Sequence, residues 1–179
     1  YKRGTSVYLV DRVIPMLPEV LSNGICSLNA GEDRYAMTCM MEIDAHGKVV
    51  NYRIQPSIIH VNRRCSYKEI YKALTEDIIP DDLAPLMLMI HNLSDIAKTL
   101  NDMRRRRGAL DFDFPEYKVL LDTEGTPLRI VRRDRTLAER LIEECMLIAN
   151  ETVATHLKNT NRTSVYRIHE TPSEEKMSM

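Results

Sequence analysis

Residues 35–61, YAMTCMMEIDAHGKVVNYRIQPSIIHV, contain the pattern that decides the fold of this chain. Apolar residues at every second position from Tyr35 to Ile43 alternate with mostly smaller or polar neighbours, which is the period of a half-buried β-strand. The residues Asp44-Ala45-His46-Gly47 are typical of a turn, and Lys48 to Val61 are predicted to return as a second strand. The stretch therefore predicts a long β-hairpin.

Two helices are predicted directly after this hairpin. Ser66 and Glu69 have the spacing of a capping box, in which each side chain accepts a hydrogen bond from the other residue's backbone amide, so a helix is expected from here to about Asp77. A longer helix is expected from about Asp82 to Arg107, with Gly108 as the residue that ends it. Its predicted buried stripe contains the apolar residues at three- and four-residue spacing, which are Leu86, Met89, Leu93, Ile96 and Leu100.

A second hairpin, a third helix and a short strand complete the predicted elements. Residues 117–121 and 128–132 flank a turn that contains glycine, and a capping box at Thr136 opens a helix to about Leu157. A last strand is predicted at Val165 to Ile168. The predicted buried stripe of the third helix consists of Leu137, Leu141, Cys145, Ile148 and Thr152, with Glu143 and Glu144 on other faces.

The order of these elements predicts the fold class. Hairpins and long helices alternate without β-α-β spacing, which favours an α+β fold of β-hairpins packed with long helices over a doubly wound sheet. No internal repeat, low-complexity block or glycine-serine linker marks a boundary. Residues 1–179 are therefore predicted to form a single segment.

The composition is ordinary for a soluble globular protein. Of the 179 residues, 44% are hydrophobic and 28% are charged, and no apolar run approaches the roughly 20 residues of a membrane span. The 25 basic and 26 acidic residues argue against wholesale electrostatic binding of nucleic acid. The four cysteines include no C-x-x-C pair, so zinc and disulfides are not expected, and a reducing cytoplasm is the predicted location.

The first thirty residues combine many apolar side chains with Pro15, Pro18 and Gly24. The prolines fix φ and remove backbone donors, and the glycine permits a positive φ, so this segment predicts an irregular backbone that packs against a core. Irregular backbone of this kind usually presents side chains to a ligand. Tyr8 is the first candidate for such a contact.

Several strings resemble one known family, and among them are Ile-Pro-Met-Leu-Pro at 14–18, Leu-Ser-x-x-x-Cys-Ser-Leu at 21–28 and Arg-Ile-His-x-x-Pro-Ser at 167–173. They are similar to the catalytic domain of the ribonuclease II/ribonuclease R exoribonucleases, and the last string is closer to ribonuclease R. The resemblance covers essentially the whole chain. It implies processive hydrolysis of single-stranded RNA from the 3′ end to nucleoside monophosphates, in a cytoplasmic enzyme that uses Mg²⁺.

The resemblance also implies that parts of the catalytic machinery lie elsewhere. In the family, a quartet of aspartates that binds Mg²⁺ precedes the segment seen here, and a catalytic glutamate follows it. The chain is therefore expected to be an internal piece of a larger catalytic domain, incomplete at both ends and inactive alone. The close carboxylate pairs that it does contain, Asp81-Asp82, Asp111-x-Asp113 and Glu143-Glu144, do not predict a metal site.

The resemblance implies roles in RNA binding for Tyr8, Tyr67, Phe112 and Glu143, and Arg3 joins these candidates only through its position in the sequence. Tyr8 matches a tyrosine that packs against a base, and Phe112 is its expected partner, with Phe114 as a rival. Tyr67 and Glu143 match positions near the terminal riboses, where they could distinguish RNA from DNA by the 2′-hydroxyl. Arg3 is expected to contact phosphate because it is near Tyr8 in sequence.

Each assignment has a structural alternative. Tyr8 and Phe112 could be core residues, Tyr67 could lie on the surface at a helix start, and Glu143 could belong to a solvated helix face. The arginines at 104–107 could follow RNA or could only complement the dipole of their helix, and they are not assigned to the site.

The alternative function is a non-catalytic RNA-binding or assembly module, and a protein-interaction domain is the least favoured. No membrane partner is expected, and the sequence predicts no particular protein partner.

Overall fold

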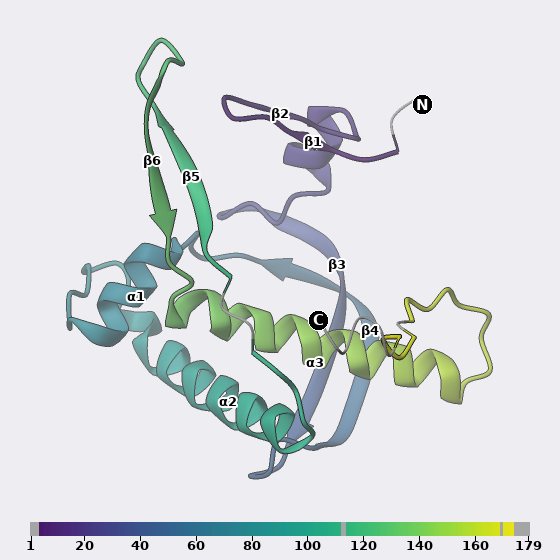
Figure 1. Cartoon of the computed structure of the whole chain (residues 1–179). Helices are drawn as coiled ribbons and strands as arrows, with labels where there is room; N and C mark the ends of the chain where they lie inside the picture. Colours follow the sequence, from purple (N-terminus) through teal and green to yellow (C-terminus); the bar gives the residue numbers. More distant parts are fainter. Residues whose placement is uncertain (1–3, 112–113, 169, 174–179) are drawn as a thin grey trace.

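The computed structural model describes residues 4–111, 114–168 and 170–173 (Figure 1). Its strands form three separate antiparallel hairpins, and the helices α2 and α3 lie side by side. This arrangement confirms the predicted α+β class. The elements in chain order are β1 (Val7–Tyr8), β2 (Val13–Ile14), the π-helix η1 (Val20–Ile25), β3 (Asp33–Ile43), β4 (Val49–His60), α1 (Tyr67–Thr75), the 3₁₀ helix η2 (Ala84–Leu86), α2 (Met87–Arg106), β5 (Glu116–Leu121), β6 (Pro127–Arg133) and α3 (Leu137–Asn159).

The long hairpin of β3 and β4 is confirmed, and its turn packs against α2. The Asp44 carboxylate accepts hydrogen bonds at 2.9 Å from the backbone amides of both His46 and Lys48. Gly47 has a φ of 86°, and a Cβ atom at this position would lie only 3.0 Å from Cβ of Met103. Glycine is therefore required here both by the left-handed backbone and by the close approach of α2.

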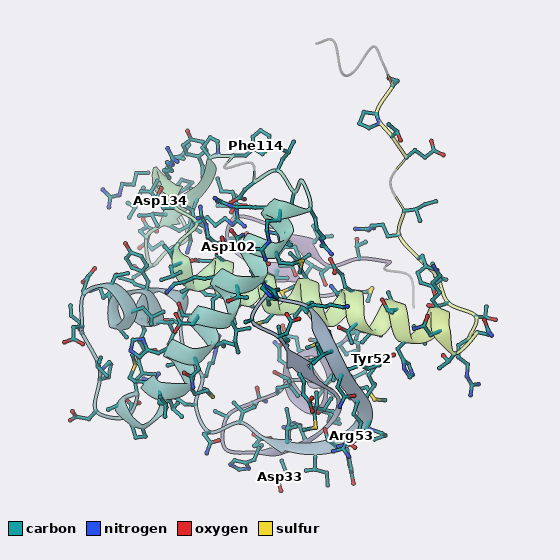
Figure 2. All side chains as sticks on the ribbon, turned by 90° about the horizontal axis from the view of Figure 1, so that it is seen from below. Asp33, Tyr52, Arg53, Asp102, Phe114 and Asp134 are labelled. Atoms are coloured by element: carbon teal, nitrogen blue, oxygen red, sulfur yellow. The ribbon has the colours of Figure 1, made fainter. Side chains whose placement is uncertain are left out.

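Only the turn half of this hairpin is covered, which corrects the predicted alternation. Tyr35 and Met37 are 89% and 70% exposed, although they share a strand face with the half-buried Met41. The reason is that α3 reaches only the half near the turn. There, the rings of Tyr52 on β4 and His156 on α3 meet edge-on with centroids 5.7 Å apart, and Figure 2 shows Tyr52 beside α3.

The core forms where α1, the segment before α2, α2 and α3 meet, and it includes Leu83 and Leu100 as fully buried side chains. The stripe predicted for α2 is wrong in part, because Met89 and Ile96 are exposed. The small side chains of Ser94 and Ala97 are also buried, and they let neighbouring elements approach α2 closely. A search for large apolar residues does not find such positions. The buried residues of α2 are Met87, Ile90, Ser94, Ala97 and Leu100.

Two segments near the ends of the chain differ from their predictions. The segment before β3 forms the small hairpin of β1 and β2 followed by η1, but its apolar residues Val10, Val20 and Ile25 are exposed rather than packed against a core. The strand predicted at Val165 to Ile168 is absent, since no strand within the described residues pairs with it. No helix of the described part is both long enough and apolar enough to span a membrane.

Candidate functional site

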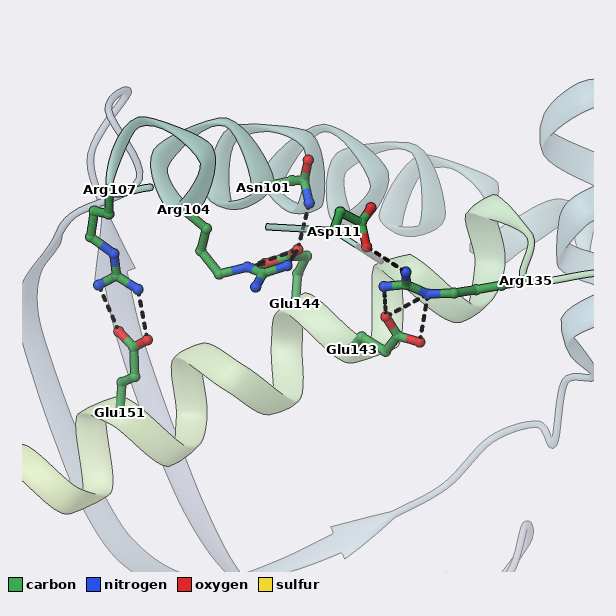
Figure 3. A network of polar contacts seen from close by, with 8 residues as sticks. All are labelled: Asn101, Arg104, Arg107, Asp111, Arg135, Glu143, Glu144 and Glu151. Atoms are coloured by element: carbon green, nitrogen blue, oxygen red, sulfur yellow. Dashed lines mark hydrogen bonds and ion pairs between the residues drawn. The ribbon is translucent and has the colours of Figure 1, made fainter. Parts of the chain in front are cut away.

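Glu143 lies near the start of α3 and is oriented by a single arginine (Figure 3). The predicted capping box starts this helix: the backbone amide of Thr136 donates to the Glu139 carboxylate at 3.0 Å. Just before the box, Arg135 donates from Nε to both carboxylate oxygens of Glu143 at 3.0 Å, and its Nη2 also pairs with Oε2. The Glu143 side chain remains 41% exposed, so it is fixed in direction but open to a ligand.

The same arginine binds a second carboxylate from a different segment. Nη1 of Arg135 donates to Oδ1 of Asp111 at 2.7 Å, and the Asp111 side chain is only 24% exposed. This hydrogen bond lowers the pKa of Asp111 below its usual range. Asp111 follows α2 and directly precedes Phe112 in the sequence. Arg135 therefore connects the segment after α2 to the first turns of α3.

The neighbouring residue, Glu144, sets the rotation of α3 about its axis. Contrary to the prediction, its side chain is buried, and Arg104 and Asn101 of α2 each donate to its Oε1 at 2.8 Å. The pairing raises the pKa of Arg104. Because successive helix residues are about 100° apart around the axis, a Glu144 that faces α2 directs Glu143 to the side, toward Arg135.

Tyr67 is the first residue of α1, and its position follows from the confirmed capping box. The Glu69 amide donates to the Ser66 hydroxyl at 3.3 Å, and Arg63 donates to the Glu69 carboxylate at 2.6 Å and to Asp82 at 2.8 Å. These bonds lower the pKa of both carboxyl groups. Tyr67 is exposed, and α1 packs against α3, so Tyr67 and Glu143 lie on neighbouring helices (Figure 1).

Tyr8 lies on a different part of the molecule. It belongs to the hairpin of β1 and β2, where it pairs with Val13, and it is 78% exposed, so it is not a core residue of the described chain. Val10 and Asp11 of the same hairpin line an open groove of about 460 Å³ against β5 and β6. Within the described residues, no hydrogen bond or ion pair connects Tyr8 to Tyr67 or Glu143.

Two predicted site residues, Arg3 and Phe112, lie outside the described residues, and their roles stay predictions. Phe114, the rival of Phe112, is exposed at the edge of the molecule (Figure 2). Besides Arg104, two arginines of the run that follows Met103 make contacts within the protein. Arg107 binds Glu151 of α3 at 2.9 Å, and Arg106 donates to the backbone carbonyl of His46 at 3.0 Å. These contacts favour the structural account of this basic run.

The described residues do not fit the Mg²⁺ that the resemblance implies. Within them, no group of three or more histidine, cysteine, aspartate or glutamate side chains is placed to bind a metal ion. Each of the three close carboxylate pairs also has a member that binds a guanidinium group: Asp82 binds Arg63, Asp111 binds Arg135 and Glu144 binds Arg104. No reaction step through a metal follows from these residues.

Sequence reasoning missed Arg135 as part of this site. It stands in a basic cluster, and its partners are 8 and 24 residues away in sequence, so no helical or strand period connects them. The nearest usable signal was its position directly before the N-cap residue Thr136, which places it at the end of the helix that carries Glu143.

A family model described as the RNB domain matches residues 1–179 of the chain. The chain belongs to the RNB domain family. The chain is 47% identical over 176 residues to ribonuclease R of Thermotoga maritima and 44% identical over 178 residues to ribonuclease R 1 of Lactococcus lactis subsp. lactis. These matches cover 98% and 99% of this chain, respectively. They cover only 25% of the Thermotoga maritima protein and 22% of the Lactococcus lactis protein, so the chain spans about a quarter of its relatives' length.

A solved structure agrees with this assignment. The chain superposes on Mycoplasma genitalium RNase R in complex with ribose methylated single-stranded RNA, with a TM-score of 0.91 and 31% sequence identity. The match covers 97% of this chain and 27% of that protein. The expected membership of the ribonuclease II/ribonuclease R family, on the ribonuclease R side, is therefore confirmed.

Proposed function

We propose that this chain works within a processive 3′-to-5′ exoribonuclease that hydrolyses single-stranded RNA to nucleoside monophosphates. In this proposal the chain supplies walls of the RNA channel, and the Mg²⁺-binding aspartates belong to other parts of the complete enzyme. We use "complete enzyme" for this chain together with the remaining sequence that its longer relatives have. The proposal is supported by the similarity to ribonuclease R proteins, one of which holds single-stranded RNA in its solved structure.

The observation that carries the proposal is the exposed but oriented carboxylate of Glu143. A carboxylate has about four positions that accept hydrogen bonds, and Arg135 makes three contacts with the two Glu143 oxygens. The remaining capacity suits a donor such as the 2′-hydroxyl of a ribose, which DNA lacks. Tyr67, exposed on the neighbouring helix, offers a second hydroxyl for the sugar.

The second wall in this proposal binds bases. An exposed aromatic ring suits stacking, which is worth roughly 1 to 3 kcal/mol per base and has no strong sequence preference, as a processive nuclease requires. Tyr8 presents such a ring. Phe112 is proposed as its partner and Arg3 as a phosphate contact. The cytoplasmic location stays a prediction.

The test of the ribose-reading role uses Glu143→Gln in the complete enzyme. We measure kcat/KM for an RNA oligonucleotide and for the same oligonucleotide with 2′-deoxyribose at its 3′-terminal positions. Loss of the charged acceptor should lower the preference for RNA by about tenfold, since a hydrogen bond to a charged group contributes about 1.5 to 3 kcal/mol. Glu151→Gln, on the same helix, is the matched control.

The outcomes separate the candidate functions. An RNA preference that Glu143→Gln leaves intact contradicts the ribose-reading role. A complete enzyme that binds single-stranded RNA but releases no mononucleotides supports the alternative, a non-catalytic RNA-binding or assembly module on the same scaffold.

A further inference from the structure

Arg135 joins two acidic residues that come from separate parts of the chain. Its Nε and Nη2 atoms serve Glu143 on α3, and its Nη1 atom serves Asp111 after α2. The arginine is only 28% exposed, and Figure 3 shows its side chain between the two carboxylates. All three guanidinium nitrogens are thus used within the protein.

We propose that Arg135 is a positioning residue for sugar selectivity, because it holds the Glu143 carboxylate in one orientation and ties the Asp111 segment to it. The inference rests on the proposed ribose-reading role of Glu143. It adds that selectivity depends on a residue that does not itself contact RNA. It also links the segment leading to Phe112 with the helix that carries Glu143.

The geometry explains why an arginine is needed. A free glutamate side chain on a helix surface samples several rotamers, and a ligand that binds only one of them must fix it first. The planar guanidinium donates to both Glu143 oxygens and therefore fixes the plane of the carboxylate as well as its direction. Lysine carries the same charge but has no planar set of donors, so it cannot bind two carboxylates in this manner.

Charge gives the arginine a second effect on the same site. Two carboxylates beside a polyanionic strand would repel its phosphates, and the guanidinium between them cancels one of the two negative charges. The positive charges of Arg105 and Arg140 also lower the pKa of Asp111, but less than Arg135 does. The site can therefore present an acceptor to a hydroxyl without a large negative field.

The experiment compares Arg135→Met and Arg135→Lys in the complete enzyme, with the RNA and 3′-deoxyribose-terminated substrates described for Glu143. Both substitutions should lower the RNA-over-DNA ratio of kcat/KM by about tenfold. A purely electrostatic role predicts that lysine restores the ratio, and the positioning role predicts that it does not. In a Glu143→Gln background, Arg135→Met should change the ratio by less than about twofold, because the two residues act as one unit.

The matched control is Arg107→Met. It removes the ion pair between Arg107 and Glu151, which is a second arginine-glutamate pair that involves α3. It should leave the ratio unchanged. If Arg135→Met fails to fold, Asp111→Asn decides instead, since it weakens only one of the two connections. We expect it to lower the ratio in the same direction, and an unchanged ratio overturns the proposal.

The remaining outcomes distinguish this inference from the proposed function. An Arg135→Met enzyme that keeps its ratio while Glu143→Gln loses it refutes the positioning role and leaves the ribose-reading role standing. An equal fall of kcat/KM on both substrates means that Arg135 is only structural. If Glu143→Gln itself changes nothing, the ribose-reading role fails first.

Discussion

Tyr8 shows at the scale of one residue how its surroundings decide its use. Its strand β1 is two residues long and pairs only with β2, so no element of the described chain covers the ring. The sequence predicted an irregular segment packed against a core, and that expectation is wrong for the described residues. The apolar character of the segment was visible in the sequence, but what covers it depends on contacts that no local pattern encodes.

Replacement of Tyr8 by alanine in the complete enzyme should change where degradation stops more than how fast each bond breaks. Stacking positions the RNA, whereas the reacting groups cleave it, so the final resistant product should lengthen or shorten while the single-turnover rate falls less. Denaturing gels of the end products and rapid-quench rates measure the two effects. Tyr8→Phe keeps the ring and serves as the control. An unchanged end product together with a collapsed rate contradicts the stacking role.

At the scale of an element, α3 combines two adjacent glutamates with opposite environments. Its N-terminus follows from the local capping box at Thr136, which was predictable because both partners lie within four residues. The burial of Glu144 was not predictable, since its partners Asn101 and Arg104 lie 43 and 40 residues away on α2. A helix stripe drawn from apolar residues alone places such a paired charge on the wrong face.

Arg104→Met should destabilise the domain by about 3 kcal/mol, because it leaves the buried Glu144 carboxylate without its charged partner. The comparison is Arg107→Met, whose partner Glu151 is exposed and whose loss should cost at most about 1 kcal/mol. Denaturant unfolding of the complete enzyme, followed by a probe in this domain, measures both. Equal effects of the two substitutions contradict the assigned importance of the buried pair.

At the scale of the whole molecule, local signals predicted the larger elements and distant contacts determined the site. Both capping boxes, the three helices and the two larger hairpins follow from residues close in sequence, and so they were predicted. The exposure of Tyr35 and the double pairing of Arg135 depend on which elements meet in space. The family resemblance supplied the site residues, but it did not supply the arginine that orients one of them.

The 179-residue chain on its own should release no mononucleotides from labelled oligo(A) in the presence of Mg²⁺. Hydrolysis of phosphodiesters by two metal ions requires clustered carboxylates that hold the two ions about 4 Å apart, and the described residues contain no such cluster. Thin-layer chromatography of the products measures the release. Robust release of mononucleotides means that the catalytic carboxylates lie within this chain after all.

The uncovered half of the β3–β4 hairpin affects how that assay is carried out. The exposed side chains of Tyr35 and Met37 on β3 and of Ile58 on β4 form an apolar patch on one face of the hairpin. Exposed apolar patches on strands promote self-association in concentrated samples. Analytical ultracentrifugation before the assay therefore shows whether an inactive sample is monomeric or is an aggregate in which these surfaces are buried.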